Sequence, residues 1–319
     1  MLEIALARPR MRALFAAGSG LAFTGLVAVL GFQPTPARSA LEIVADIPGV
    51  YPLDLYDAPS AATSSDRTIN VADRVSVASL ADDFQARGYS MLRVRATENA
   101  VPRIILAQLP QDIHTIDSIE QRKDIFIATL LPILLAESER IARLRVRLED
   151  VVRLAEAGAT LSESDRAWLG RLAEQFKVDA GDFDELLLRV DSVPPSLAIA
   201  QAALESGWGT SRVARVSQAL FGHTTGVWRD GADQPDLRRF ATLSEAVAAY
   251  VENRNTNRAY VRVRAARAAM RRNGGELDAH ALANHLLRYS ERGADYVRDV
   301  RALIRTNELL AFDGARFVD

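Results

Sequence analysis

The fold of this chain is decided by residues 193–222, which read VPPSLAIAQAALESGWGTSRVARVSQALFG. A break at Pro194 is followed by small and apolar residues of high helix propensity, and Pro195 suits the first turn of a helix. Gly207 fits the position just after a helix end, where the backbone turns left-handed. The sequence therefore predicts an alanine-rich helix that begins at Pro195 and ends at Gly207.

Glu205 lies in the last turn of this predicted helix, where the negative end of the macrodipole disfavours a carboxylate. The dipole contributes only about 0.3–1 kcal/mol, less than about one pKa unit. Desolvation by neighbours such as Leu204 and Trp208 therefore has to supply most of a shift towards neutrality. A carboxylic acid held neutral in this way is the general acid of glycoside hydrolysis. The alternative is an ordinary ion pair with Arg212 or Arg215, but two glycines and a tryptophan in the same turn favour function.

Most of the remaining chain also has a helical pattern. Residues 117–157 repeat apolar side chains at three- and four-residue spacing, with an interruption expected at Pro132. Ser162 is the expected N-cap of another helix, and Thr242 and Glu245 form the capping box of a third. Further helices are expected at residues 80–87, 182–191, 258–272, 278–287 and 294–309.

Only a few segments favour strands. Residues 90–95 and 103–106 are expected to form short strands, and residues 226–240 have hairpin character around a turn at Asp230. The predicted fold class is therefore mainly α (α+β), with a small β lobe and a helical N-terminal region before the helix that carries Glu205.

The first 40 residues have the features of an export signal. Arg8, Arg10 and Arg12 precede an uncharged stretch at residues 13–32, and small residues follow it. Twenty uncharged residues span about 30 Å as a helix, so the stretch is either a cleaved signal peptide or a retained inner-membrane anchor. In both cases the positive-inside rule predicts that the rest of the chain is exported to the bacterial periplasm or cell envelope.

Composition excludes several classes of function. The chain has 319 residues, no cysteine and a formal net charge of −2. It therefore has no disulfides, no thiolate metal site and no overall positive field that would indicate nucleic acid. The four histidines are scattered along the sequence, so neither a metal site nor another cofactor is expected.

Residues 193–222 closely resemble the glucosaminidase domain of glycoside hydrolase family 73, within its Bax-like branch of bacterial envelope proteins. The specific part is the Glu-Ser-Gly-Trp-Gly-Thr-Ser run with a downstream Leu-Phe-Gly. The resemblance implies a lysozyme-like α fold that hydrolyses β-1,4 bonds after N-acetylglucosamine in peptidoglycan, with Glu205 as the acid catalyst. About two-thirds of the chain is covered, because the match continues in residues 101–103, 130–132, 253–260, 289–297 and 304–307.

The expected organisation follows from these features. The expected partners are peptidoglycan glycan strands and, through residues 13–32, the inner membrane. Four regions are expected: a signal peptide or N-terminal membrane anchor at 1–40, a partly flexible linker at 41–75, a mainly helical region at 76–190 and the glucosaminidase catalytic domain at 191–312.

The resemblance also suggests residues around Glu205. Tyr289 lies where the family's cleft tyrosine is expected, and a phenol can orient a water or the substrate's acetamido group. Trp208 is equally suited to stacking on a sugar ring and to core packing. The other candidates for substrate contact are Phe221 and three residues for which packing or helix docking is the favoured interpretation, Gln201, Tyr260 and Tyr296.

The second carboxylate stays open. In an inverting enzyme it stands about 6.5–9.5 Å from the acid, and in this family it comes from the β lobe. Asp230, Asp233 and Asp236 are the candidates, although an ordinary turn aspartate is the favoured interpretation of each, and the loop looks shorter than in relatives. The substrate's own 2-acetamido oxygen can attack the anomeric carbon instead. A third alternative is that the lobe has lost activity.

Two other functions compete with the hydrolase. A lytic transglycosylase also uses one glutamate in a Glu-Ser-Gly turn, but such relatives usually carry a Gly-Leu-Met-Gln run where this chain has Leu-Phe-Gly. A non-catalytic glycan-binding envelope scaffold is favoured by the short β lobe and by the helical N-terminal region, which could pack against partners.

Overall fold

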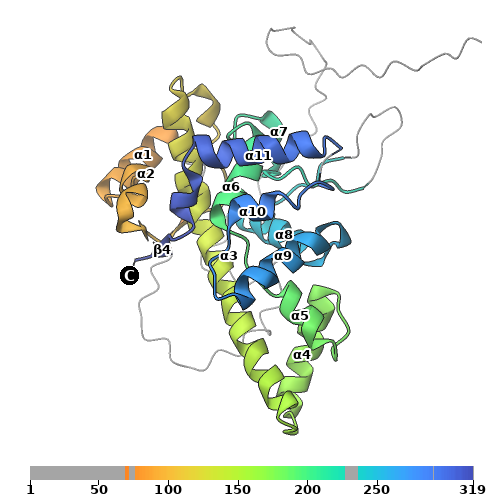
Figure 1. Cartoon of the computed structure of the whole chain (residues 1–319). Coiled ribbons are helices and arrows are strands. Elements are labelled where there is room, and N and C mark those ends of the chain that lie inside the picture. Colours follow the sequence, from red (N-terminus) through yellow and green to blue (C-terminus); the bar gives the residue numbers. More distant parts are fainter. Residues whose placement is uncertain (1–68, 72–75, 227–235, 290, 319) are drawn as a thin grey trace, which may run out of the picture. The chain divides into compact units, whose positions relative to one another are not determined.

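The structure is a computed structural model that describes residues 69–71, 76–226, 236–289 and 291–318 (Figure 1). The predictions on residues 1–40, on Asp230 and on Asp233 lie outside the described residues, as do those on almost all of 41–75. The chain divides into the units Met1–Ser39 and Ala40–Asp319, and all described residues belong to the second. Among them, no helix combines the length and the apolar character needed to cross a membrane.

The described residues are mainly helical, which confirms the predicted fold class. Their longest element is α3 (Ile119–Glu156), a helix of 38 residues. Pro132 lies inside α3 without interrupting it, so the break expected there is wrong. A proline removes one backbone hydrogen bond, and the deep burial of the surrounding turns, from Ile125 to Leu135, holds the helix together across the defect.

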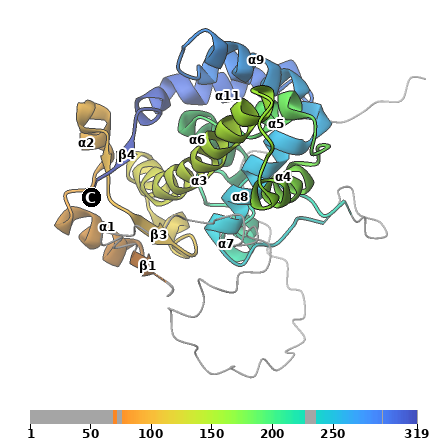
Figure 2. The same cartoon turned by 90° about the horizontal axis from the view of Figure 1, so that it is seen from below.

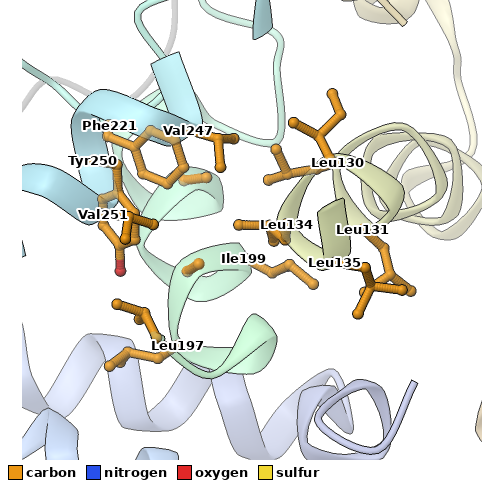
Figure 3. Packing of buried hydrophobic residues seen from close by; sticks show 14 of the residues in the cluster. Leu130, Leu131, Leu134, Leu135, Leu197, Ile199, Phe221, Val247, Tyr250 and Val251 are labelled. Carbon is orange, nitrogen blue, oxygen red and sulfur yellow. The ribbon is translucent and has the colours of Figure 1, made fainter. Parts of the chain in front are cut away.

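Helix α6 (Pro195–Ser206) lies at the centre of the core and carries Glu205 in its last turn. It packs against α3, α11 (Ala294–Thr306) and the 3₁₀ turn η5 (Leu309–Phe312). Figure 3 shows Ile199 of α6 and Leu134 of α3 side by side in this core. The predicted boundaries are confirmed, because Pro195 occupies the first turn and Gly207 has a φ of +61° at the end.

Residues 77–106, which precede α3, lie on the other side of that helix from α6 and α8 (Leu243–Thr256), as Figures 1 and 2 show. The strand predicted at residues 90–95 is wrong: α2 (Met91–Arg93) continues there into a π-helical turn, η2 (Val94–Glu98). Ser90 caps this helix, and Met91 and Val94 are buried at helical spacing. The other elements of the region are α1 (Val77–Ala86), η3 (Ile113–Thr115), β1 (Ile69–Val71) parallel to β3 (Ile104–Leu106), and β2 (Ala100–Val101) parallel to β4 (Arg316–Phe317).

The predicted helix caps are confirmed in the rest of the chain. The hydroxyl of Ser162 accepts a hydrogen bond from the Asp165 N–H at 3.1 Å. The hydroxyl of Thr242 accepts one from the Glu245 N–H at 3.1 Å, and the Glu245 carboxylate accepts one from the Ala241 N–H at 2.8 Å. The remaining helices are α4 (Glu163–Phe176), α5 (Phe183–Arg189), α7 (Arg212–Ser217), η4 (Arg258–Tyr260), α9 (Val261–Arg272) and α10 (Ala279–Ala283).

The β lobe begins and ends with an antiparallel pairing between Thr224 and Leu237. The Thr225 N–H donates to the Asp236 carbonyl at 2.7 Å, and the Arg238 N–H donates to the His223 carbonyl at 2.8 Å. These bonds are those of the predicted hairpin, whose residues 227–235 lie outside the described part of the chain.

A buried charge cluster fixes the connection between α5 and α6. The carboxylate of Asp191 lies 3.4 Å from Nε of Arg267, 3.0 Å from Nη2 of Arg271 and 3.9 Å from Nη1 of Arg145. Arg267 also donates to the backbone carbonyls of Leu188 and Ser192. Burial by itself would raise the pKa of Asp191, but the three guanidinium groups hold it below its ordinary value. The cluster therefore joins α3 and α9 to the residues that lead into α6.

Candidate active site

A cavity of about 570 Å³ opens beside the end of α6. Part of its lining is a face of α8, whose lining residues recur at helical spacing, and Glu205 and the segment that follows α7 also line it. The described residues that line it are Lys177, Glu205, Phe221, Gly222, His223, Thr224, Arg238, Ala249, Glu252, Asn253, Thr256, Asn257, Tyr260 and Tyr289.

Glu205 faces this cavity from the last turn of α6. The residue as a whole is exposed, while the backbone of Gly222 lies close to its carboxyl group. Desolvation raises the pKa of the carboxyl group, while the hydroxyls of Tyr296 and Tyr289 and the charge of Arg254 oppose the rise. No ion pair joins Glu205 to another described residue, and Arg215 donates to the Gln111 carbonyl instead. Burial around the carboxyl group thus favours its protonated form.

Two tyrosines and Gln201 form a chain of hydrogen bonds behind Glu205. The Tyr250 hydroxyl donates to Oε1 of Gln201 at 2.7 Å, and Nε2 of Gln201 donates to the Tyr296 hydroxyl at 2.9 Å. Gln201 is 0% exposed and Tyr296 is 2% exposed, and neither lines the cavity. Both residues therefore lie in the packing position that the sequence favoured for them, behind the residues that line the cavity. Tyr289 does line the cavity, and its hydroxyl donates to the Phe221 carbonyl at 2.8 Å.

Arg254 of α8 lies beneath these aromatic rings. Its guanidinium carbon is 4.4 Å from the ring centres of Tyr250 and Tyr260 and 4.6 Å from that of Tyr289. None of its three guanidinium nitrogens has a hydrogen-bond partner among the described residues. Two of the three stacked tyrosines, Tyr260 and Tyr289, line the cavity, so this buried cation supports part of its wall.

The segment after α7 brings its backbone against Glu205. Phe221 stacks on Tyr250 with ring centres 4.1 Å apart. Gly222 has a φ of +66°, and a Cβ atom there would lie 2.9 Å from Oε2 of Glu205. Gly222 is therefore required both by its backbone conformation and by the position of the carboxyl group.

His223 follows Gly222 in this segment. Burial, together with the charges of Arg254 and Arg238, lowers the pKa of His223 to about 4, so its ring is neutral at physiological pH.

Two predicted site residues lie elsewhere. Trp208 does not line the cavity: its ring meets Phe126 of α3 edge-on, with centres 5.8 Å apart, and Nζ of Lys123 lies 5.7 Å from its centre. Of its two predicted roles, packing is the one that these contacts support. Asp236 belongs to the β-lobe pairing and does not line the cavity.

Sequence reasoning missed several residues of the cavity. Glu252 is a second carboxylate there, and it pairs with Lys177 at 3.5 Å. Lys177 comes from the end of α4, between the stretches 130–132 and 193–222 that carried the resemblance. The polar residues Glu252, Asn253 and Thr256 share one helical face, and that spacing was the available signal. The sequence places Tyr250 and Tyr260 near Arg254, but nothing in it brings the distant Tyr289 to the same guanidinium group.

Comparisons with known proteins agree with this arrangement. Residues 182–309 match the family model described as mannosyl-glycoprotein endo-beta-N-acetylglucosaminidase. The chain is 32% identical over 208 residues to the protein bax of Escherichia coli (strain K12). The matched residues make up 62% of this chain and 74% of that protein. No solved structure matches the chain. The glucosaminidase domain supports a glycan-cleaving hydrolase that acts on glycoconjugates. The chain belongs to the Bax-like proteins that carry a glucosaminidase domain.

Proposed function

We propose that this protein is an exported peptidoglycan hydrolase that cleaves the β-1,4 bond after N-acetylglucosamine, with Glu205 as its general acid. The observation that carries the proposal is a carboxyl group of raised pKa at a helix end, facing a cavity lined by polar side chains. The family match supports a glycan substrate. Location in the periplasm or cell envelope rests on the basic and uncharged pattern of residues 8–32.

The proposed reaction begins with proton donation. Glu205 gives its proton to the glycosidic oxygen while the bond from that oxygen to the anomeric carbon breaks, and the electron pair stays on the leaving oxygen. In one route the substrate's acetamido oxygen bonds to the anomeric carbon, and a water then displaces it and gives a proton back to the Glu205 carboxylate. In the other route water bonds to the anomeric carbon directly and loses its proton to a second carboxylate or to solvent. The amides of Asn253 and Asn257 line the cavity and suit the hydroxyl and acetamido groups of the sugar.

Product analysis tests the proposal against its rivals. Purified peptidoglycan incubated with the protein is expected to gain reducing N-acetylglucosamine ends. A lytic transglycosylase would leave anhydro ends instead, and a non-catalytic scaffold would bind glycan without producing either. Loss of reducing-end release in Glu205→Gln would assign the activity to this cavity.

Glu252 shares the cavity with Glu205, but its ion pair with Lys177 already uses its carboxylate. We expect Glu252→Gln to keep the hydrolysis rate within about tenfold of wild type, because an exposed ion pair contributes at most about 1 kcal/mol. The expected product is then the β-anomer formed through the acetamido group, as judged by proton NMR during the reaction. A loss of about 10²–10⁴-fold, with an α-anomeric product, would instead make Glu252 the base of an inverting mechanism.

Gly222 offers a second test of the site. We expect Gly222→Ala to reduce hydrolysis by roughly tenfold or more, because its methyl group would displace a catalytic carboxyl group. The matched control is Gly274→Ala, since Gly274 has a φ of +68° and nothing within 4 Å of its Cβ position. Both variants should lose about 1–2 kcal/mol of stability from the left-handed backbone, as measured by thermal unfolding. Equal activity of the two variants would contradict the contact with Glu205.

A further inference from the structure

Arg254 is a buried cation with no carboxylate beside it. The residue is 1% exposed, and no described residue accepts a hydrogen bond from its guanidinium nitrogens. A charge taken out of water without a partner costs several kcal/mol. Such a group is kept only where other interactions offset the cost.

The tyrosine rings supply part of the compensation. The guanidinium carbon lies within 4.6 Å of the centres of three rings, those of Tyr250, Tyr260 and Tyr289. Each such contact is stronger when it is desolvated, and a planar guanidinium stacks on rings in a way that an ammonium does not. Arg254 therefore fixes the orientation of Tyr260 and Tyr289 in the cavity wall.

The nearby carboxyl group explains why a cation would be placed there. The charge of Arg254 acts on Glu205 and favours its ionised form. Before the reaction Glu205 is protonated, so the cation has no opposite charge to meet. When the proton leaves, the carboxylate and the guanidinium attract one another. An interaction that appears only as the proton is transferred lowers the barrier rather than tightening substrate binding.

We propose that Arg254 is a positioning residue that holds the tyrosine wall in place and provides the counter-charge for Glu205 once it has given up its proton. The inference rests on the proposed role of Glu205 as the acid. Arg254 neither gains nor loses a proton: the O–H bond of Glu205 breaks, an O–H bond forms on the leaving sugar, and the electron pair left on Glu205 is stabilised.

The first test uses the wild-type protein and needs no activity. The ¹⁵N resonances of the Arg254 guanidinium are expected to shift with pH at the midpoint at which the ¹³C-labelled carboxyl group of Glu205 titrates. This shift should disappear in Glu205→Gln. Arg254 resonances that do not respond to Glu205 would overturn the inference, whatever the protein does to peptidoglycan.

The second test changes Arg254 itself. Arg254→Met keeps the length and the apolar contact with the rings but removes the charge. We expect the pKa of Glu205 to rise and the alkaline limb of the kcat/KM profile to move to higher pH, because the cation no longer favours the anion. We expect kcat to fall roughly ten- to hundredfold, at or below the loss of a direct hydrogen-bond donor. Arg254→Lys keeps the charge, so the limb should stay near its wild-type position while kcat recovers in part.

Other groups around Glu205 provide the control. The hydroxyls of Tyr296 and Tyr289, the ring of Tyr260 and the charge of Arg292 also interact with Glu205. Arg292→Met should move the limb less than Arg254→Met, because Arg292 is exposed and pairs with Asp299. If the Arg254→Met variant is folded and the alkaline limb of its kcat/KM profile lies at the wild-type pH, the inference is overturned. If hydrolysis is absent but the Arg254 guanidinium and Glu205 carboxyl resonances titrate together, the result supports Arg254 as the counter-charge. Only the proposed reaction is then contradicted.

Discussion

Glu205→Gln is expected to lower the release of reducing ends from purified peptidoglycan by about 10²–10⁴-fold, the usual contribution of a general acid. Glutamine has nearly the same shape and polarity, but it has no proton to give to the leaving oxygen. Because desolvation raises the pKa of Glu205, the wild-type enzyme should keep its acid protonated to a higher pH than an ordinary glutamate would allow. Activity should decline as the pH rises through that pKa.

Stability separates a chemical effect from a structural one. Glu205 lies at the negative end of α6, so its neutral replacement should leave the midpoint of thermal unfolding unchanged or slightly raised. Glu174→Gln, on the exposed surface of α4, is the control that should change neither rate nor stability. Equal release of reducing ends by wild type and Glu205→Gln would exclude Glu205 as the acid.

Asp191→Ala should lower the free energy of unfolding by about 3–5 kcal/mol, the loss typical of a buried charge deprived of its partner. The substitution would leave Arg267, which is 2% exposed, facing Arg271 and Arg145 without a carboxylate between them. Urea unfolding at neutral pH measures this loss. A fall of less than 1 kcal/mol would show that the arginines find other partners.

The same cluster makes a prediction about acid. The folded-state pKa of Asp191 lies below its unfolded value, because the three arginines outweigh the effect of burial. Its contribution to stability is therefore complete above the unfolded pKa of 3.8 and is lost as pH falls through the folded one. The matched control is Asp150→Ala, because Asp150 forms an exposed pair with Arg153 on α3 and should contribute at most about 1 kcal/mol.

Helix ends could be predicted from the sequence because capping is local chemistry. Ser162, Thr242, Pro195 and Gly207 each act within one helical turn, and the structure confirms all four. Errors arose where distant contacts decide the conformation, as at Pro132. Burial against the rest of the chain sustains a helix across that proline, and nothing in the neighbouring residues records it.

The candidate site also has features that local sequence predicts and features that depend on distant contacts. Glu205 could be identified from one turn of sequence, since the glycines, the tryptophan and the helix end lie within a few residues of it. The sequence also placed Gln201 on the same helix as Glu205, but it did not give the direction of the Gln201 side chain. That direction depends on how α6 packs against α8 and α11. Arg254 went unnoticed because its aromatic surroundings are complete only in the fold: Tyr250 and Tyr260 lie close to it in the sequence, but Tyr289 comes from a distant segment.

The position of α3 has a consequence for how such a protein can evolve. The helix precedes the residues that match the family, yet it packs directly against α6, and Phe126 lies 3.1 Å from the Cβ position of Gly209 in the turn after Glu205. At the other end of the sequence, β4 pairs with β2. A gene fragment that encoded residues 182–309 alone would produce a chain in which α6 lacks its packing partner α3. The glucosaminidase part of this chain is therefore not an independent module, and a recombined gene that keeps this packing has to carry the upstream helix as well.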